Sequence, residues 1–238
     1  MEQLFNYTIE RHFPEIIGSK NKGIDFLYAV IEQQASLITS WMRVGFIHGV
    51  MNTDNVALSG ETIDYGPCAF LDNYNPLTVF SSIDHQGRYA FANQPIISQW
   101  NLARLAETIL PLININQEHA IKLAEEAINS FTELYQNKWL DMMRLKIGLS
   151  TRELRDKDLI VDLLNIFEKN NADFTNTFRS LSESSLFDKE IFLSEEFNHW
   201  QSKWKARLKN ESKTLEEIKK VMELNNPTVI PRNHIVEK

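Results

Sequence analysis

The side chains with the clearest chemical potential lie in two short polar stretches of the first third of the chain. Asp54 and Asn55 are neighbours at the end of the stretch HGVMNTDN, and Asp64 follows in the stretch IDYG. Carboxylate and amide oxygens are ligands that Mg²⁺ prefers, and transfer of a phosphoryl or nucleotidyl group needs few other protein groups. These three side chains could therefore converge on one metal-bound triphosphate.

The order of the two stretches along the chain is more informative than either stretch alone. In kinase-like folds a loop after a long helix supplies catalytic residues, and a later hairpin presents a metal-binding Asp before a glycine. Here a predicted long helix ends just before His48, a predicted hairpin follows Asn55, and Asp64-Tyr-Gly stands where a kinase has Asp-Phe-Gly. The order indicates a kinase-like transferase centre.

One position departs from the kinase pattern. Kinases place the catalytic Asp about five residues before the metal-binding Asn, and the residue there is Val50. Valine can neither accept a proton nor bind a metal, so by the bare kinase template the protein is a pseudokinase. Asp54, directly beside Asn55, supplies a carboxylate instead.

Each of these features also has a purely structural interpretation. An isolated Asp-Asn pair more often caps a turn, and Asp64-Tyr-Gly-Pro67 alone is more often a turn than a metal site. We expect His48 to hold the loop through nearby backbone, and Cys68 to act as a small apolar filler. The joint order of the features favours the catalytic interpretation over the structural one.

The elements that must position these residues are mostly helices. Apolar residues at three-to-four spacing predict a long amphipathic helix over 26–46. Residues 47–99 change to short apolar runs separated by Gly, Pro, Asn and Asp, with a hairpin turn expected at residues 58–61. The periodicity predicts further helices, and the second of them could be one helix or two: 100–112, 116–147, 157–170, 189–209 and 213–224. We expect a mainly α fold with a small β-hairpin region.

Composition narrows the class of protein. The 238 residues carry a formal net charge of -7 and no clustered basic stretch, which argues against nucleic-acid binding. No apolar run is long enough to span a membrane, no secretory signal is present, and the single cysteine precludes an internal disulfide. We predict a cytoplasmic protein that binds neither nucleic acid nor membrane.

Longer motifs carry a resemblance to a known family. The sequence resembles the SelO/YdiU family over nearly its whole length, and the motifs that carry the resemblance are HGVMNTDN (48–55), TIDYGPCAF (62–70), WLDMMRLKIG (139–148), ADFTNTFR (172–179) and NPTVIPRNHIVE (226–237). The pair formed by the first two motifs is highly specific. This resemblance implies the C-lobe of a protein-kinase-like fold over residues 1–113, followed by a helical C-terminal region over residues 114–238.

The resemblance also implies a reaction and roles for three residues. Members of the family transfer AMP from ATP to Ser, Thr or Tyr hydroxyls of other proteins with release of pyrophosphate, and use of UTP with Mn²⁺ is also known. By motif position, Asp54 corresponds to the proton acceptor. Asn55 and Asp64 correspond to the Mg²⁺ ligands, and Asp64 also lies near the ATP.

The sequence departs from the family pattern at both ends. The glycine-rich loop, the phosphate-contacting Lys and its Glu partner have no counterpart here, nor has the tail with its redox-active cysteine or selenocysteine. We therefore expect an internal segment of the family that is inactive alone. Two alternatives stay open: half of a split enzyme that needs a separate N-terminal half, and a helical binding module that retains the ancestral loop and self-associates through an exposed face.

Overall fold

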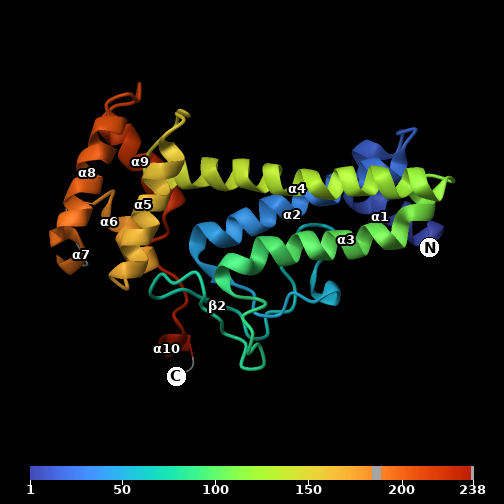
Figure 1. The fold of residues 1–238 in the computed structure, drawn as a ribbon, viewed down its shortest axis with the longest axis horizontal. Helices are drawn as coiled ribbons and strands as arrows, with labels where there is room; N and C mark the ends of the chain where they lie inside the picture. The colour runs from blue at the N-terminus through green and yellow to red at the C-terminus, as the bar shows by residue number, and fades with distance from the viewer. Residues whose placement is uncertain (184–188, 237–238) are drawn as a thin grey trace. The chain divides into compact units, whose positions relative to one another are not determined.

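The computed structural model describes residues 1–183 and 189–236, and it is mainly helical (Figure 1). The chain divides into two compact units, each assembled from segments that are far apart in the sequence. The first unit comprises Met1–Thr39, Val50–Gly66 and Asn93–Lys138. The second unit comprises Ser40–Gly49, Pro67–Ala92 and Trp139–Lys238. Because these units interleave along the chain, the predicted division between residues 113 and 114 stays a prediction.

The first unit is a layer of helices around one apolar core. Its helices, two of which continue into the second unit, are α1 (Glu2–His12), α2 (Lys22–Val44), α3 (Gln94–Ile113) and α4 (Gln117–Lys146). Figure 1 shows α2, α3 and α4 running alongside one another. Their buried residues form a single cluster: Phe5, Ile9, Phe13, Phe26, Leu27, Val30, Ile31, Ala35, Leu102, Ala106, Ile109, Ala124, Ala127 and Phe131. Removal of this apolar surface from water is the main force that holds the helices together.

Glycine allows the closest approach in this unit. A Cβ atom added to Gly23, in the first turn of α2, would lie 2.2 Å from the carbonyl oxygen of Leu112 near the end of α3. Any side chain at position 23 would therefore push these two helix ends apart.

Between α2 and α3 the first unit contains a polar loop, Val50–Gly66. It contains a 3-10 turn, Thr53–Asn55, and an isolated antiparallel bridge between Val56 and Thr62. The chain turns at Gly60, which has a φ of +74° and whose N–H donates to the carbonyl of Ala57 at 3.1 Å. The predicted hairpin turn is thus present, although its two arms pair through one bridge rather than through regular strands.

The second unit combines a minimal sheet with helices. Strands β1 (Phe46–Ile47) and β2 (Ala69–Phe70) pair antiparallel, with Phe46 opposite Phe70 and Ile47 opposite Ala69. The helices of this unit are α5 (Asp156–Lys169), α6 (Phe174–Ser180), α7 (Lys189–Leu193), α8 (Glu195–Leu208), α9 (Leu215–Asn225) and α10 (Asn233–Val236). Two short 3-10 turns complete the elements, Pro14–Ile16 in the first unit and Phe91–Asn93 at the start of α3.

Two tryptophans of α8 anchor the helices of the second unit. The rings of Trp200 and Trp204 stack at a centroid distance of 5.4 Å. Their indole N–H groups donate to the carbonyls of Leu159 and Ile147, each at 2.8 Å. Buried indoles need such a partner, and here the partners tie α8 to α5 and to the end of α4.

Each predicted helix lies over helical residues of the structure, with informative differences. The pattern over 116–147 is one helix. The predicted helix over 189–209 is two, because the Ser194 hydroxyl accepts from the N–H of Phe197 and starts a new helix. Helices α1 and α6 were not predicted. No helix of the described residues is long and apolar enough to cross a membrane; the cytoplasmic location stays a prediction.

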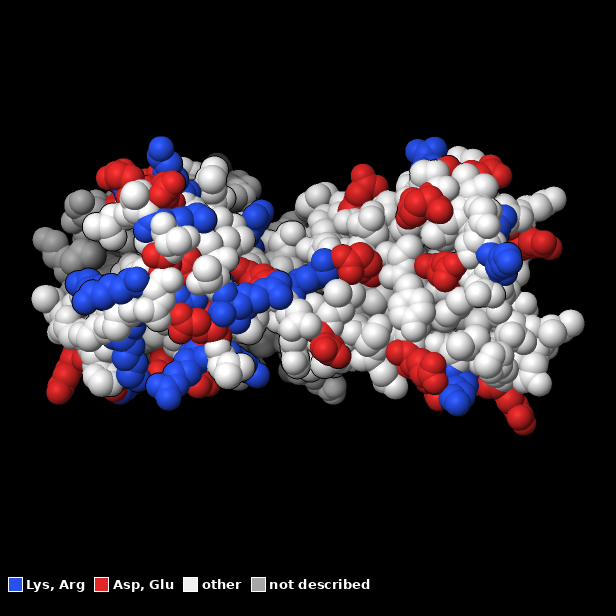
Figure 2. All heavy atoms as spheres, turned by 90° about the horizontal axis from the view of Figure 1, so that it is seen from above, with Lys and Arg blue, Asp and Glu red and all other residues white. Residues whose placement is uncertain are grey.

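Charged side chains of both signs lie among uncharged side chains on the face drawn in Figure 2. On the face drawn in Figure 2, Lys and Arg side chains lie among Asp and Glu side chains rather than in a patch of one sign. Such a mixture of signs is ordinary for the surface of a globular protein.

Candidate functional site

The residues that lead into the polar loop follow the end of α2 and belong to the second unit. Gly45, with a φ of +74°, ends the helix, and β1 follows it directly. His48 comes next and is fully buried, with its ring 5.4 Å from the ring of Trp41 and 6.4 Å from that of Phe46. Gly49 has a φ of +86°, and a Cβ there would lie 2.9 Å from the carbonyl oxygen of Pro67. The chain is therefore closely confined just before the candidate residues begin.

Asn55 is held by Val50, the residue at the position where the kinase pattern predicts an Asp. Its Nδ2 donates to the carbonyl oxygen of Val50 at 3.1 Å, and its backbone N–H donates to the carbonyl of Asn52 at 2.9 Å. With Nδ2 committed to Val50, the oxygen Oδ1 is the atom of this side chain that can bind a cation. Val50 thus contributes to the loop through its main chain, although its side chain carries no functional group.

Asp64 adopts a backbone conformation that is uncommon outside glycine. Its φ is +55°, and Asn171 is the one other non-glycine among the described residues with a positive φ. Asp tolerates this left-handed region better than most residues, but the conformation still costs about 1 kcal/mol. Such strain persists where surrounding structure enforces it and is frequent at functional sites.

The bridge between Val56 and Thr62 brings the two candidate stretches together. Val56 directly follows Asn55, and Thr62 precedes Asp64 by two residues. Asp54 lies in the same 3-10 turn as Asn55. The carboxylates of Asp54 and Asp64 belong to solvent-exposed residues, whereas Asn55 is half-buried. The structure therefore places all three predicted residues on adjacent arms of one loop.

Asn55 and Asp64 carry amide and carboxylate oxygens, which are the kinds of ligand that Mg²⁺ prefers. Among residues 1–183 and 189–236, no group of three or more His, Cys, Asp or Glu could hold a metal ion. Mg²⁺ differs from Zn²⁺ or Ca²⁺ in this respect, because it usually takes one or two protein ligands and completes its shell with water and substrate phosphates. One neutral and one charged oxygen ligand at an exposed loop fit that pattern.

Two contacts to this loop had no counterpart in the sequence motifs. Gln34 of α2 donates through Nε2 to the carbonyl of Ala57 at 2.7 Å. Asn101 of α3 donates through Nδ2 to the carbonyl of Met51 at 3.0 Å. A pattern search could not have identified them, because a buried amide in an amphipathic helix has no distinguishing neighbours.

A small cavity lies against the same loop. It has a volume of about 240 Å³, and its lining is mostly apolar with a few polar groups: Val30, Gln34, Thr53, Val56, Leu58, Asn101, Leu102, Arg104, Leu105 and Thr108. Arg104 is engaged elsewhere, since its guanidinium pairs with Glu107 at 2.8 Å and lies 5.3 Å from the ring centroid of Trp100.

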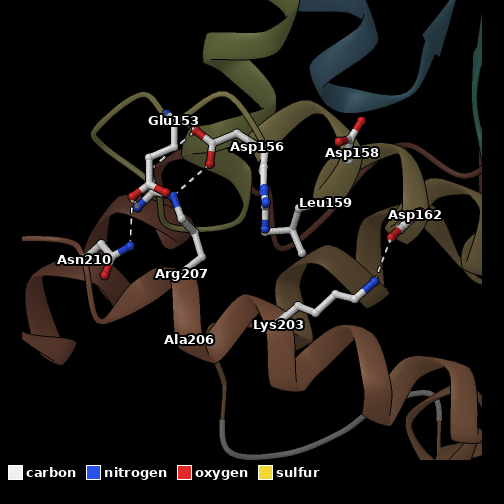
Figure 3. Close-up of a pocket in the computed structure, with 10 residues that line it drawn as sticks. Glu153, Asp156, Asp158, Leu159, Asp162, Lys203, Ala206, Arg207 and Asn210 are labelled. Atoms are coloured by element: carbon white, nitrogen blue, oxygen red, sulfur yellow. Dashed lines mark hydrogen bonds and ion pairs between the residues drawn. The ribbon is translucent and has the colours of Figure 1, made fainter.

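The strongest charge cluster of the described residues lies in the second unit, at a larger pocket of about 590 Å³. Figure 3 shows Arg207 between Asp156 and Glu153, and Lys203 pointing toward Asp162. Arg207 donates to Asp156 at 2.8 Å, and the side chains of Arg207 and Asp156 are 8% and 1% exposed. The pocket lining mixes both signs of charge, so it indicates no one class of ligand.

The carboxylates of this cluster are held ionised by their partners. Burial raises the pKa of Asp156, but hydrogen bonds from Arg207, from the N–H of Glu153 and from Arg144 outweigh it, so the pKa is lowered. For Glu211 burial also raises the pKa, and hydrogen bonds from Thr151, Ser150 and Arg207 lower it further than burial raises it. These interactions join the end of α4, the start of α5 and the end of α8, which is a structural role.

Lys146 is a second buried charge of the second unit. Its Nζ donates to the carbonyl of Arg43 at 2.8 Å and lies 4.1 Å and 5.1 Å from the ring centroids of Phe178 and Phe174. Burial lowers the pKa of Lys146 well below its usual range, with a smaller contribution from the charge of Arg43. The contact ties the end of α4 to the last turn of α2, from which the chain enters the loop.

The fold and the loop define a mainly helical protein with a candidate site for a metal-bound nucleotide. The family described as Protein adenylyltransferase SelO matches residues 1–238. A Protein nucleotidyltransferase YdiU from Clostridium perfringens (strain SM101 / Type A) is 53% identical over 238 residues, which are 100% of this chain and 49% of the relative. The chain belongs to the SelO family.

Other relatives give the same result. Proteins of the same name from Nitrosococcus oceani and from Pelagibacter ubique are 54% identical over 237 residues and 52% identical over 238 residues. Each alignment covers 100% of this chain, and 48% and 49% of the respective relatives. The chain thus spans about half the length of the curated relatives that it matches.

Proposed function

We propose that this chain carries the metal and acceptor half of a protein adenylyltransferase site, which transfers AMP from ATP to Ser, Thr or Tyr hydroxyls and releases pyrophosphate. Membership in the SelO family and the names of the relatives support nucleotidyl transfer. The observation that carries the proposal is the hydrogen bond from Asn55 to the Val50 carbonyl, which leaves Oδ1 available in the loop whose other arm leads to the strained Asp64.

Each candidate residue has a defined part in this reaction. Asn55 and Asp64 would hold Mg²⁺ or Mn²⁺, and a cation bound there would supply positive charge for the phosphates. The acceptor hydroxyl oxygen forms a bond to the α-phosphorus of ATP, the bond to the pyrophosphate oxygen breaks, and the hydroxyl proton passes to Asp54. An exposed carboxylate is a weak base, so positioning of the hydroxyl contributes more than proton removal.

We further propose that the elements around the loop form the C-lobe of a kinase-like fold. Helix α2 leads into β1, the loop with Asn55 follows, then the hairpin and Asp64, and then β2, which pairs back with β1. This order is the one that kinase-like folds use to present their metal ligands. The pairing of β1 with β2 supports it, because it joins the segments just before and just after the candidate residues.

The 238 residues alone should bind nucleotide weakly. The resemblance assigns the glycine-rich loop and the phosphate-contacting Lys to the half of the family sequence that is not matched here. Without those groups the triphosphate is held mainly through the metal, so we propose that transfer needs the other half, on the same chain or on a separate one. A helical binding module without any nucleotide site is the competing function.

Binding of Mn²⁺-ATP to the chain tests the site. Mn²⁺ replaces Mg²⁺ at oxygen ligands, and its electron paramagnetic resonance signal reports the free and bound metal. We expect Asn55→Ala and Asp64→Asn to weaken binding about 10- to 100-fold. Asp54→Asn is the matched control in the same loop, because a proton acceptor is not needed for binding. Equal binding by all four proteins would contradict the assignment, and absence of binding by the wild-type chain would favour the helical module.

The position of the label distinguishes the reaction. The chain, combined with the half of a family member that it does not match, is incubated with Mn²⁺, a heat-treated protein extract and ATP labelled at either the α- or the γ-phosphate. Any transferred label should come from the α-phosphate, and α-labelled UTP tests uridylyl transfer in parallel. Transfer from the γ-phosphate would show phosphoryl transfer and overturn the proposal, as would α-label transfer that survives Asp64→Asn.

A further inference from the structure

Two buried amide side chains, those of Gln34 and Asn101, donate hydrogen bonds to the main chain of the polar loop. One bond lies before Asp54 and the other lies after Asn55 in the sequence. Gln34 is 2% exposed and lies on α2, and Asn101 is 5% exposed and lies on α3. Asn101 binds the carbonyl of Met51, three residues before Asp54, and Gln34 binds the carbonyl of Ala57, two residues after Asn55. All of these residues belong to the first unit.

The cost of burying Asn101 is only partly compensated. Its Nδ2 is hydrogen-bonded, but its Oδ1 is buried without a hydrogen-bond partner. A buried amide oxygen without a partner destabilises the folded state. An apolar side chain of the same size would avoid the cost of the unpaired Oδ1, but it would release the Met51 carbonyl from its hydrogen bond. What the amide provides, and leucine could not, is a donor aimed at Met51.

The hydrogen bonds from Gln34 and Asn101 connect the loop to helices α2 and α3. The two arms of the hairpin are joined by one bridge, and Asn55 is fixed by its bond to Val50, a neighbour within the loop. The bonds from Gln34 and Asn101 add a connection to the rigid part of the first unit, because both helices are packed into its apolar core.

We propose that Gln34 and Asn101 are positioning residues for nucleotide transfer: they hold the Met51–Ala57 main chain so that Asn55 and Asp54 face the metal-bound nucleotide. This inference rests on the proposed function of the loop. Neither residue touches substrate; each acts through the main chain. Partners of this kind that orient metal ligands affect metal affinity strongly even though they do not contact the ion.

The chain offers a matched control on the same helix. Gln99 of α3, which is half-buried, also donates to a carbonyl, in this case from Nε2 to Ile128 of α4 at 3.0 Å. Its bond joins two helices and does not reach the loop. Gln99→Met therefore removes the same type of hydrogen bond, as Gln34→Met does, without releasing the candidate residues. Asn101→Leu is the corresponding change at the third position.

The test compares affinity for Mn²⁺-ATP with thermal stability in the full chain. We expect Gln34→Met and Asn101→Leu each to weaken binding about tenfold, and Gln99→Met to leave it unchanged at a similar shift in Tm. In an Asn55→Ala background, Asn101→Leu should have no further effect on binding, because its influence passes through Asn55. Weakening that is equal in all three variants, or additive with Asn55→Ala, would overturn the proposal.

A second measurement separates this proposal from the proposed function. Without nucleotide, hydrogen exchange of the Asn55 N–H, which is bonded to the Asn52 carbonyl, reports the order of the loop. Exchange should be faster in Asn101→Leu and Gln34→Met than in Gln99→Met. If the wild-type chain binds no Mn²⁺-ATP, the proposed function fails while faster exchange still shows that the two amides hold the loop. Unchanged exchange would overturn the positioning role whatever the nucleotide result.

Discussion

The loop of Asp54, Asn55 and Asp64 and the cluster around Asp156 use the same kinds of side chain in opposite ways. The carboxylates of the loop are exposed and lie on a segment with uncommon backbone geometry. Asp156 and Glu211 are 1% and 8% exposed as residues and are bonded to arginines, hydroxyls and backbone N–H groups. In this protein the lowered pKa values of Asp156 and Glu211 mark a cluster of hydrogen bonds and ion pairs that joins helices. The role of that cluster is structural.

The largest expected effect would confirm the structural half of this comparison. Asp156→Ala leaves Arg207 and Arg144 without their shared buried partner, so the free energy of unfolding should fall by about 3–5 kcal/mol. Urea denaturation followed by circular dichroism measures it. Asp158→Ala, an exposed acid on the same helix, should change stability by less than about 0.5 kcal/mol. A loss at Asp156 no larger than that at Asp158 would contradict the structural role.

The next effect concerns Lys146 and alkaline pH. Its folded-state pKa lies well below the usual 10.5, so between the two values the unfolded chain binds more protons and stability rises with pH. The free energy of unfolding should therefore increase from pH 7 to 9.5, and Lys146→Met should remove the increase. The pH range stops there because burial, with help from Glu168, raises the pKa of Tyr74 to about 12, which lowers stability above pH 10. A slope that is unchanged in Lys146→Met would refute this assignment.

A moderate effect is expected in acid. The folded-state pKa values of Asp156 and Glu211 are lowered from 3.8 and 4.5. Their contribution to stability is therefore complete above these values and is lost as pH falls through the lower, folded-state pKa values. Glu211→Gln should flatten the decrease in unfolding free energy below pH 4.5. Thermal melts between pH 3 and 6 measure it, and an equally steep decrease in the variant would show that other carboxylates cause the acid sensitivity.

The smallest expected change in stability concerns Asp64, in the loop. Asp64→Gly relieves the left-handed strain at φ +55° but adds freedom to the unfolded chain, so the unfolding free energy should change by less than about 1 kcal/mol. Binding of Mn²⁺-ATP should nevertheless be lost with the carboxylate. A large loss of stability would instead mean that Asp64 is a structural residue.

Several features of the fold and the site could be predicted from local sequence. The three-to-four spacing of apolar residues predicted the long helices, because an amphipathic helix must bury one face. The hairpin turn was predictable because a glycine such as Gly60 is favoured where φ is positive. The order of HGVMNTDN and TIDYGP indicated the candidate residues and the family. Helix α6 was not predicted, because its start depends on the Asp173 side chain, which caps the N–H of Asn176, and such a cap is a weak signal in a short segment.

The sequence by itself determined the helices, the adjacent Asp54 and Asn55, and membership in the SelO family, since each depends on residues that are close in the chain or on an extended match. Tertiary structure alone decided which polar residues lie inside. Asn101 meets Met51 and Lys146 meets Arg43 across separations of 50 and 103 residues. A helix presents a buried amide or ammonium in the same local pattern as an exposed one, and only packing shows which carbonyl it must reach.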